Sequence, residues 1–421
     1  MEKKGALYKI KDLNVLGQYL SLPRNVYILF VAKTANSLGT LVFSFLTLYL
    51  TGKLSISEDI AGIYVTMASL AFAPGSLLGG KLSDLVNRKY IYIVFQGAAG
   101  ICFFLCAFFD NSLLVPWLLI FAQLFVAGAQ TANSAMVMDE TTAENRKQAF
   151  SLLFLGTNVG IGVGALLVGF MFKNHIKLLF LGCSIAIFVA IVIVAVFIKE
   201  SIPLEGEKEA KYEKNPAEDK ANLSVIKLIL QKPILIAFAL VCVVYSFVHS
   251  QYSFSLPLQV NAAFDTKGPE IYGTLMTVNS LTIIVMTAFI TSLTLKSKTL
   301  TNIIRAGGFF AVGFGMVALA DNIWLMIIST IIWSTGEILY NTNSNVYIAD
   351  NTTEAFRGRL SAIFTIVSSS GFAISPVFMG FFIRWQGINK VWPLLFVLSV
   401  IAMLLMSLIN LKENRSIKKI R

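Results

Sequence analysis

The sequence predicts an all-α integral membrane protein whose twelve transmembrane helices form two pseudo-symmetric six-helix bundles. The 421 residues are 56% hydrophobic and only 14% charged, and the mean hydropathy is +0.74, which the surface of a water-soluble domain does not tolerate. Apolar stretches of about 20 residues, enough to cross a hydrocarbon core of about 30 Å, recur between short polar turns. In addition, the second half of the chain repeats features of the first.

The repeat has an offset of 211 residues. Without any gap, this offset produces the following pairs: Asp139 with Asp350, Thr141 with Thr352, Thr142 with Thr353, Arg146 with Arg357, Gly160 with Gly371, and Gly169-Phe170 with Gly380-Phe381. Each copy therefore has an acid-Thr-Thr-Arg turn between two apolar helices. We infer a duplicated unit of half the chain, and we expect the function at the interface between the two copies.

Because backbone polar groups must be satisfied internally in lipid, apolar stretches of this length are helices rather than barrel strands. In chain order, the predicted spans are 25–51, 60–82, 89–109, 115–138, 148–172, 178–198, 233–257, 270–295, 302–320, 323–348, 359–383 and 391–411. Every gap between two spans contains charged or amide side chains, and several also contain Gly or Pro, so each gap reads as a turn.

The charged residues outside the spans predict the topology. The predicted segments are a basic cytoplasmic lead-in (1–24), an N-terminal six-helix bundle (25–198), a charged cytoplasmic linker (199–232), a C-terminal six-helix bundle (233–411) and a basic cytoplasmic tail (412–421). Lys and Arg concentrate on the cytoplasmic side of membrane proteins, so both termini are expected there, in a multi-pass protein of the cell inner (plasma) membrane. Lys173 and Arg384 depart from this rule, since both fall on predicted outer turns.

Several function classes are disfavoured by composition. The net charge of +11 reflects the bias of cytoplasmic loops and contact with anionic membrane lipids rather than binding to nucleic acid. All four cysteines fall within spans and have no metal-ligand spacing with either histidine, so neither a metal nor a cofactor is expected. No Gly-Lys-Ser/Thr phosphate loop is present, which disfavours ATP as the energy source.

The turn after the second span carries a recognisable motif. It reads GKLSDLVNRK and matches the pattern G-x-L-x-D-R-x-G-R-K at Gly80, Leu82, Asp84, Arg88 and Lys89. In this respect the chain resembles the major facilitator superfamily. Asn87 replaces the second Gly, and we expect it to adopt a left-handed turn. The resemblance implies a conformational latch formed by Gly80, Asp84, Arg88 and Lys89, whose acid pairs with the opposite half in one conformation.

The fifth span resembles a second motif, the G-x-x-x-G-x-x-x-G-P-x-x-G-G pattern of antiporters in that superfamily. The matching glycines are Gly156, Gly160, Gly164 and Gly169, while Ala165 and Val168 depart from the pattern. Glycines spaced by four share a face and allow close helix approach. Asp139 before Ala143-Glu144-Asn145-Arg146-Lys147, together with Gly336-Glu337-Ile338 in the tenth span, also resembles the bacterial multidrug permease branch. No acid precedes Leu256-Pro257 in the seventh span, however. The resemblance implies export in exchange for protons.

Glu337 is the clearest ionisable group inside a predicted span, and Tyr340, Asn341 and Ser344 follow on its helix face. A charge near the bilayer midplane is costly unless it is paired or hydrated, so this face is expected to line water. We expect Glu337 to carry the coupling proton, against the alternative of a structural, hydrogen-bonded acid. His249, which can titrate near neutral pH, is a second candidate for proton coupling, with aromatic packing as the alternative.

The resemblance implies that the first, fourth, seventh and tenth spans line a central cavity. Lys33 lies roughly 14 Å into the first span at 1.5 Å per residue, and we expect a cross-cavity ion pair between Lys33 and Glu337, with snorkelling of Lys33 as the alternative. The predicted cavity residues are Lys33, Asn36, Ser37, Gln130, Tyr245, His249, Tyr252, Glu337, Tyr340 and Asn341. Asp139 and Asp350 are expected to cap helices and pair with Arg146 and Arg357.

The sequence thus predicts a monomeric secondary active transporter, rather than an enzyme, with a small-molecule substrate, protons and membrane lipids as its partners. We expect proton-coupled export of amphiphilic or drug-like compounds by alternating access. Two alternatives keep the fold: proton-coupled uptake of a metabolite, and a lipid or lysolipid flippase in which Lys33 binds a phosphate headgroup. An intramembrane enzyme is disfavoured because clustered catalytic groups are missing from the sequence pattern, and no catalytic residue is expected.

Overall fold

The structure, a computed structural model, describes residues 19–109, 112–142, 144–198, 233–294, 297–351 and 354–420. The predicted linker 199–232 and most of the predicted lead-in 1–24 lie outside these residues. The described part of the chain contains helices and turns but no strand. The fold class predicted from composition and apolar spans, all-α and membrane-spanning, is therefore confirmed.

Twelve membrane crossings account for the helices. In the first half these are α2 (Arg24–Gly39) continued by η2 (Thr40–Phe45), α3 (Leu46–Leu48) and η3 (Tyr49–Lys53), then α4 (Glu58–Leu85), α5 (Arg88–Cys106), α6 (Leu114–Asp139), α7 (Arg146–Met171) and α8 (Ile176–Phe197). In the second half these are α11 (Pro233–His249) continued by η4 (Ser250–Tyr252) and α12 (Ser255–Phe264), then α13 (Gly268–Thr294), α14 (Thr299–Met316), α15 (Ile323–Asp350), α16 (Glu354–Gln386) and α17 (Val391–Ile420).

By length and composition alone, the described residues contain 11 stretches able to cross a membrane, one of which runs over 62 residues from Pro233 to Thr294. A continuous helix of that length would extend about 93 Å, three times the hydrocarbon thickness. This stretch is in fact two crossings, because the chain turns between α12 and α13 at Asp265, whose φ is 46°. The number of crossings is therefore the predicted twelve.

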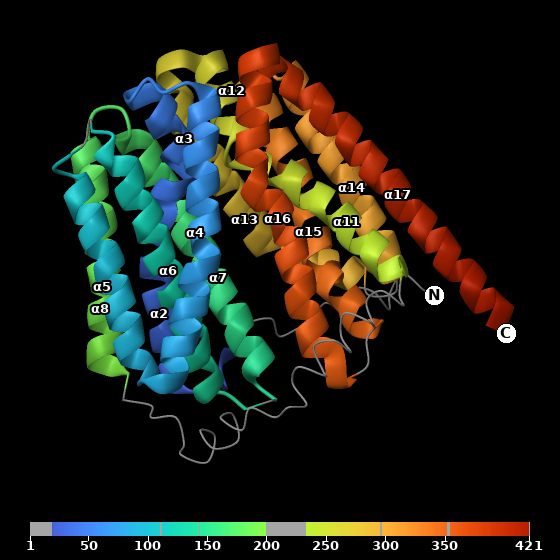
Figure 1. Cartoon of the computed structure of the whole chain (residues 1–421), viewed down its shortest axis with the longest axis horizontal. Helices are drawn as coiled ribbons and strands as arrows, with labels where there is room; N and C mark the ends of the chain where they lie inside the picture. The colour runs from blue at the N-terminus through green and yellow to red at the C-terminus, as the bar shows by residue number, and fades with distance from the viewer. Residues whose placement is uncertain are drawn as a thin grey trace.

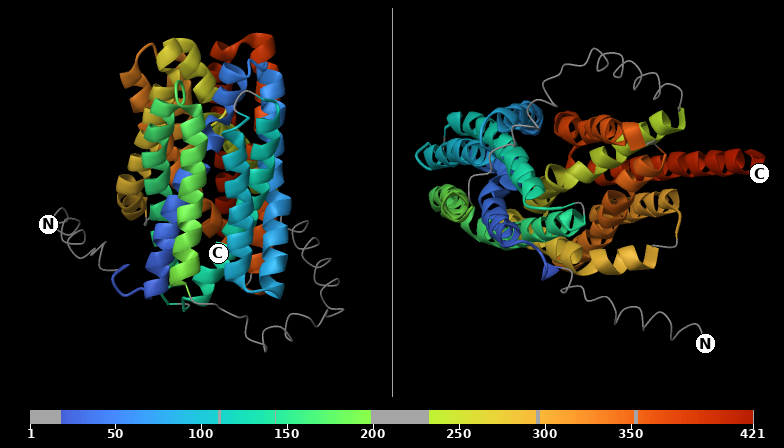
Figure 2. Two further views of the ribbon diagram at one scale, coloured as in Figure 1. Left: turned by 90° about the vertical axis from the view of Figure 1, so that its left-hand side faces the viewer. Right: turned by 90° about the horizontal axis from the view of Figure 1, so that it is seen from below.

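Helices α2 to α8 form one bundle and helices α11 to α17 form the other (Figure 1, Figure 2). The bundles meet at the end of the molecule that contains α3 and α12, here called the contact end. They diverge toward the opposite end, here called the terminal end, where α2 begins and α17 finishes (Figure 1). Two helix pairs, α4 with α16 and α7 with α13, form the seams between the bundles.

The 211-residue offset of the sequence repeat reappears in the contacts of the two seams. In the first seam, a Cβ atom added at Gly62 would overlap the carbonyl oxygen of Pro376. In the second seam, a Cβ atom added at Gly273 would overlap the carbonyl oxygen of Ala165. Gly62 and Gly273 are 211 positions apart, as are Ala165 and Pro376. The two seams are therefore related by the same pseudo-twofold axis as the bundles.

The glycine pair Gly169 and Gly380, already aligned by the repeat, extends this equivalence to the contact end. A Cβ atom added at Gly380 would overlap the carbonyl oxygen of Glu58, and one added at Gly169 would lie 2.8 Å from the carbonyl oxygen of Pro269. Glu58 and Pro269 are again 211 positions apart. Glycine is required at these positions because backbone meets backbone without room for a side chain.

An ion pair joins the first seam at its contact end. Arg384 Nη1 lies 2.8 Å and 2.7 Å from the two carboxylate oxygens of Asp59 and donates to Ser57 Oγ at 3.3 Å. The equivalent positions of the second seam hold Glu270 and Lys173, which have the same charges, but no ion pair is found between those two described residues in this conformation. Arg384 and Lys173, which depart from the positive-inside pattern, thus occupy equivalent places beside the seams.

The first and seventh crossings are both interrupted, and the interruptions are also related by the repeat. Thr40, the first residue of η2, is equivalent to Gln251 in η4. In the seventh crossing, Pro257 lacks an N–H group and displaces the carbonyl four residues earlier, which belongs to Ser253. That carbonyl instead accepts a hydrogen bond of 3.3 Å from Thr47 Oγ1 of the other half. The interruption therefore contributes a contact between the bundles.

The last helix runs on into the predicted basic tail. The tail is expected from residue 412, and α17 continues to Ile420. Residues 412–420 contain neither Gly nor Pro and include several good helix formers, so nothing in the local sequence ends the helix. Two contacts support its extension, a hydrogen bond of 2.6 Å from Lys298 Nζ to Asn414 and one of 3.2 Å from Tyr347 to Glu413.

Candidate functional site

Glu337 lies in the interior of α15, about 20 Å from the terminal end at Asp350, at 1.5 Å per residue. Its Oε2 atom lies 3.4 Å from Nε2 of His249, the last residue of α11, and the two side chains are only 15% and 17% exposed. The predicted coupling candidates are thus in direct contact. An acid and an imidazole inside an apolar bundle can share or exchange a proton while each partly compensates the other's buried charge.

Two further residues that the sequence analysis missed complete this site. The amide nitrogen of Asn279 on α13 donates to Glu337 Oε2 at 3.0 Å and to Ser334 Oγ at 2.9 Å. Ser334 precedes Glu337 by one helical turn on α15 and also donates to the carbonyl of Thr330. The signal for Ser334 was its spacing of three from Glu337, whereas Asn279 belongs to no motif. Three crossings of the C-terminal half therefore converge on one carboxylate.

Aromatic rings surround the imidazole of this pair. The ring of His249 lies 5.0 Å from Tyr252, 5.7 Å from Phe310 and 6.0 Å from Trp333, measured between centroids. Trp333 in turn stacks on Tyr252 at 5.8 Å. Trp333 is only 1% exposed, and its indole N–H has no hydrogen-bond partner among the described residues. The aromatic wall is thus mostly bundle core, with Tyr252 as its partly exposed member.

The predicted cavity residues of the first crossing do not share one environment. Lys33 is partly buried, and no described residue accepts a hydrogen bond from it. Glu337 instead lies 3.4 Å from His249 Nε2 and accepts a hydrogen bond from Asn279, so the predicted ion pair with Lys33 does not form in this conformation. Asn36 is only 7% exposed, and its Oδ1 accepts a hydrogen bond from Gln96 of α5. It therefore faces the interior of its own bundle, where the side chain of Gln96 reaches it from α5.

Two other predictions about the cavity also need correction. Ser37 is 5% exposed and lies against Gly160 of α7, within the same bundle. Tyr245 is fully buried, with its ring 6.0 Å from Phe310 and 5.8 Å from Tyr340. A shared face with His249 on α11 did not place Tyr245 at a cavity, because α14 and α15 cover α11 at that level.

The remaining members of the predicted set vary in exposure. Gln130 and Asn341 are exposed, whereas Tyr340 is only 9% exposed, with its hydroxyl 3.5 Å from Ser246 Oγ. Of the predicted cavity residues, the structure therefore brings His249, Tyr252 and Glu337 together. Their role in binding a substrate stays a prediction.

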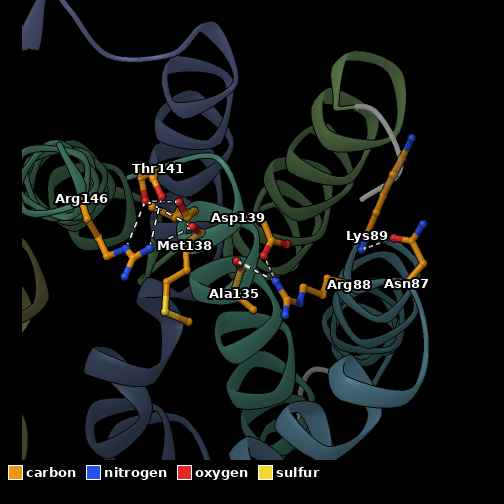
Figure 3. A network of polar contacts seen from close by, with 9 residues as sticks. Asn87, Arg88, Lys89, Ala135, Met138, Asp139, Thr141 and Arg146 are labelled. Atoms are coloured by element: carbon orange, nitrogen blue, oxygen red, sulfur yellow. Dashed lines mark hydrogen bonds and ion pairs between the residues drawn. The ribbon is translucent and has the colours of Figure 1, made fainter. Parts of the chain in front are cut away.

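The turn between α4 and α5, which resembles the superfamily signature, is held within the N-terminal half (Figure 3). Arg88 forms an ion pair with Asp139 at the end of α6, and Lys89 Nζ donates to the carbonyl of Ile198, just past the end of α8, at 2.8 Å. Both cations thus lie at helix C-termini, where the helix dipole favours positive charge. A pairing of this turn with the opposite half, as expected for a latch, stays a prediction for another conformation.

Two local expectations about this region were wrong. Asn87 has φ −54° rather than a left-handed conformation, and its side chain accepts from the backbone N–H of Lys89 as the N-cap of α5. Asp139 pairs with Arg88 rather than with the predicted Arg146, which instead donates to the carbonyl of Thr141 at 3.2 Å (Figure 3). The side chain of Arg357, the predicted partner of Asp350, lies outside the described residues.

The glycines that resemble the antiporter pattern serve two different faces of α7. Gly156, Gly160 and Gly164 meet α2 within the N-terminal half, where added Cβ atoms would press on Thr34 and Leu38. Gly169 meets Pro269 of α13 in the other half. The spacing by four therefore does predict a shared packing face, and the last glycine belongs to a seam.

Comparison with known families decides the identity of the fold. The model of the Major Facilitator Superfamily matches residues 29–320 and, in a second overlapping match, 268–418. The chain belongs to this superfamily. It is therefore a multi-pass membrane protein and a secondary transporter of the facilitator type, which the sequence motifs had suggested.

The relatives found by sequence are distant, but each matches most of the chain. The chain is 19% identical over 362 residues to a Na(+), Li(+), K(+)/H(+) antiporter of Planococcus maritimus, covering 80% of this chain and 84% of the relative. It is 22% identical over 326 residues to the uncharacterized MFS-type transporter YqjV of Bacillus subtilis (strain 168), covering 72% and 73%.

Solved structures show the same fold. A POT family transporter in complex with a thioalcohol-conjugated peptide superposes with a TM-score of 0.76 at 14% identity, covering 94% of this chain and 97% of that one. The nucleoside transporter NupG gives a TM-score of 0.75 at 14% identity, with 91% and 99% covered. At such identities the likeness concerns the fold alone. The family and these neighbours are transporters, and the relatives in complexes bind small molecules.

Proposed function

We propose that this facilitator exports an amphiphilic or drug-like small molecule in exchange for protons, and that Glu337 carries the coupling proton with His249 as its partner. The observation that carries the proposal is the contact of Glu337 with His249 Nε2 at 3.4 Å and with Asn279 at 3.0 Å, deep in the bundle. Buried ionisable residues of this kind mark proton relays in transporters. Glycines on α7 that resemble the antiporter pattern favour exchange over symport.

In this proposal the terminal end is cytoplasmic, in line with the many basic residues predicted there, and the contact end faces outward. The described conformation then has the halves together on the outer side. Protonation of Glu337 removes a negative charge from beside His249 and weakens the hydrogen bond with Asn279. The protonated site favours one arrangement of the two halves and the deprotonated site favours the other, which is the requirement for exchange.

A second candidate, antiport of a monovalent metal cation for protons, is favoured by one observation. The carboxylate of Glu337 and the hydroxyl of Ser334 lie together, bridged by the amide group of Asn279, and such oxygens are the ligands that hard cations prefer. The Planococcus maritimus relative acts on cations of this type, according to its name. The partly exposed ring of Tyr252 beside His249 is better suited to an organic cation, so we retain drug-like export as the main proposal.

The test is flux in proteoliposomes with an imposed pH gradient. The probes are a fluorescent cationic dye, a sugar, a lysolipid, and Na⁺ or K⁺. Under the main proposal, the dye moves against its concentration gradient, and its flux collapses when an ionophore removes the pH gradient. Movement of only the metal ions would support the second candidate. Flux of sugar or lysolipid without dye flux, or dye flux that ignores the pH gradient, would contradict proton-coupled drug export.

A further inference from the structure

Asn279 occupies a place that the proposed exchange does not by itself explain. It is 8% exposed, and its amide nitrogen donates to both Glu337 Oε2 and Ser334 Oγ, at 3.0 Å and 2.9 Å. An amide nitrogen carries two hydrogens, so both bonds form at once. One bond ends on a group whose charge changes with protonation, and the other on a neutral hydroxyl whose charge does not.

The same turn of α13 contacts the other half of the protein. Two residues before Asn279, Thr277 Oγ1 lies 2.7 Å from the carbonyl oxygen of Gly162 on α7. One residue after Asn279, the Cβ atom of Ser280 lies 3.1 Å from a Cβ atom added at Gly162. Residues 277 to 280 span about 4.5 Å of helix axis at 1.5 Å per residue. A single helical turn therefore connects the buried carboxylate to the seam between α7 and α13.

We propose that Asn279 is a positioning residue that transmits the protonation state of Glu337 to the seam between α7 and α13. This inference rests on the proposed role of Glu337 as the coupling acid. Hydrogen bonds to an ionised acceptor are roughly twice as strong as neutral ones. Deprotonated Glu337 therefore holds Asn279, and with it the turn that carries Thr277, in the position described. Protonation weakens the bond to Glu337, leaves Ser334 as the remaining acceptor for Asn279, and loosens this turn against Gly162.

Few other groups can produce the same pH response at this place. From α11, His249 faces Glu337 directly, and Tyr252 of η4 lies beside His249. From α13 the facing group is the amide of Asn279, and from α14 it is the apolar ring of Phe310, which stacks on His249. Among the described residues that face this site, Glu337 and His249 are thus the acid and the base, and Asn279 is bound to the first.

The experiment measures the seam directly. Spin labels on Asn174→Cys, just beyond α7, and Thr266→Cys, just before α13, report the separation of the two exposed ends of the seam. The four native cysteines are buried and are replaced by Ala to remove background labelling. Distance distributions are recorded from pH 5 to pH 8 in the otherwise wild-type protein and in Asn279→Ala. The matched control is Ser334→Ala, which removes the second acceptor of Asn279 and keeps the bond between Asn279 and Glu337.

In the wild type, we expect the ratio of molecules with a long label distance to molecules with a short one to change by about tenfold between pH 5 and pH 8. A change of this size is common for coupling between sites. In Asn279→Ala the change should fall below about twofold, whereas Ser334→Ala should retain a pH response. Asn279→Gln, which restores an amide, should recover part of the response. If Asn279→Ala fails to fold, Thr277→Val tests the same link, because it keeps the shape and removes the hydroxyl that binds Gly162.

The outcomes separate this inference from the proposed function. A wild-type pH response that persists in Glu337→Gln would refute Glu337 as the coupling acid. A response lost in Glu337→Gln but retained in both Asn279→Ala and Thr277→Val would overturn only the role of Asn279. Loss of the response in Ser334→Ala to the same extent as in Asn279→Ala would also contradict the inference, because it would point to general loosening of the bundle.

Discussion

Replacing Gly62 with Val is expected to reduce transport by at least about tenfold while the protein still folds and inserts. In the described conformation, a Cβ atom at this position would overlap the carbonyl oxygen of Pro376 across the first seam. Overpacking costs about 1–3 kcal/mol or more, and each 1.4 kcal/mol shifts a population about tenfold. Backbone atoms cannot move aside as a flexible side chain can, so the halves would be held apart at the contact end.

The measurement combines flux in proteoliposomes with the spin-label distance across the contact end. Gly97→Val is the matched control, because an added Cβ atom there meets nothing within 4 Å. The repeat leads to a second expectation. Gly273→Val should reduce transport in the same way, because its side chain would overlap the carbonyl oxygen of Ala165 in the second seam. Normal transport by Gly62→Val, or a large loss in Gly97→Val, would show that close approach at this seam is not required.

Replacing Glu337 with Gln is expected to abolish accumulation driven by the pH gradient, with a loss of about tenfold or more, while downhill exchange of substrate continues. Glutamine has the shape of the protonated acid and can still accept a hydrogen bond from Asn279, but it cannot take up or release a proton. The variant therefore mimics one protonation state permanently. Substrate flux should also become independent of pH between about 5 and 8, because the coupling proton has lost its binding site.

The check is substrate flux with and without a pH gradient in reconstituted wild type and variant. Glu270→Gln is the control, because this acid lies on the same bundle at the first turn of α13, remote from His249. Accumulation by Glu337→Gln that still follows the pH gradient would remove this residue from the mechanism. An equal loss in Glu270→Gln would mean that general electrostatics, rather than the buried site, governs the coupling.

The repeat was the part of the sequence that predicted most about the structure. An offset found in the acid-Thr-Thr-Arg turns also relates the seam contacts of Gly62 and Gly273, because duplicated helices pack through equivalent positions. Which face of a helix meets the other half could not be predicted in the same way. Asn36 lies on the polar face of the first crossing, and Tyr245 shares a face of α11 with His249. Side chains of the same bundle nevertheless cover both residues.

The partners of Glu337 show the same limit. A buried acid must be paired or hydrogen-bonded, so the sequence could predict that Glu337 has a partner but not which one. The charge of Lys33 favours it as a partner in the sequence, whereas Asn279 is brought to the site by the packing of α13 against α15, and His249 by its place at the end of α11. Hydrogen-bonding amides such as Asn279 carry no periodic signal in an otherwise apolar span, which is why this residue was missed.

The central claim is that the carboxyl group of Glu337 changes its protonation as the two halves alternate. Infrared difference spectroscopy of the reconstituted protein between pH 8 and pH 5 tests this claim most directly, because a protonated carboxylic acid has its own carbonyl stretching band. The proposed mechanism predicts a band that gains intensity as the pH falls in the wild type and is missing in Glu337→Gln. Identical difference spectra for the two proteins would contradict it.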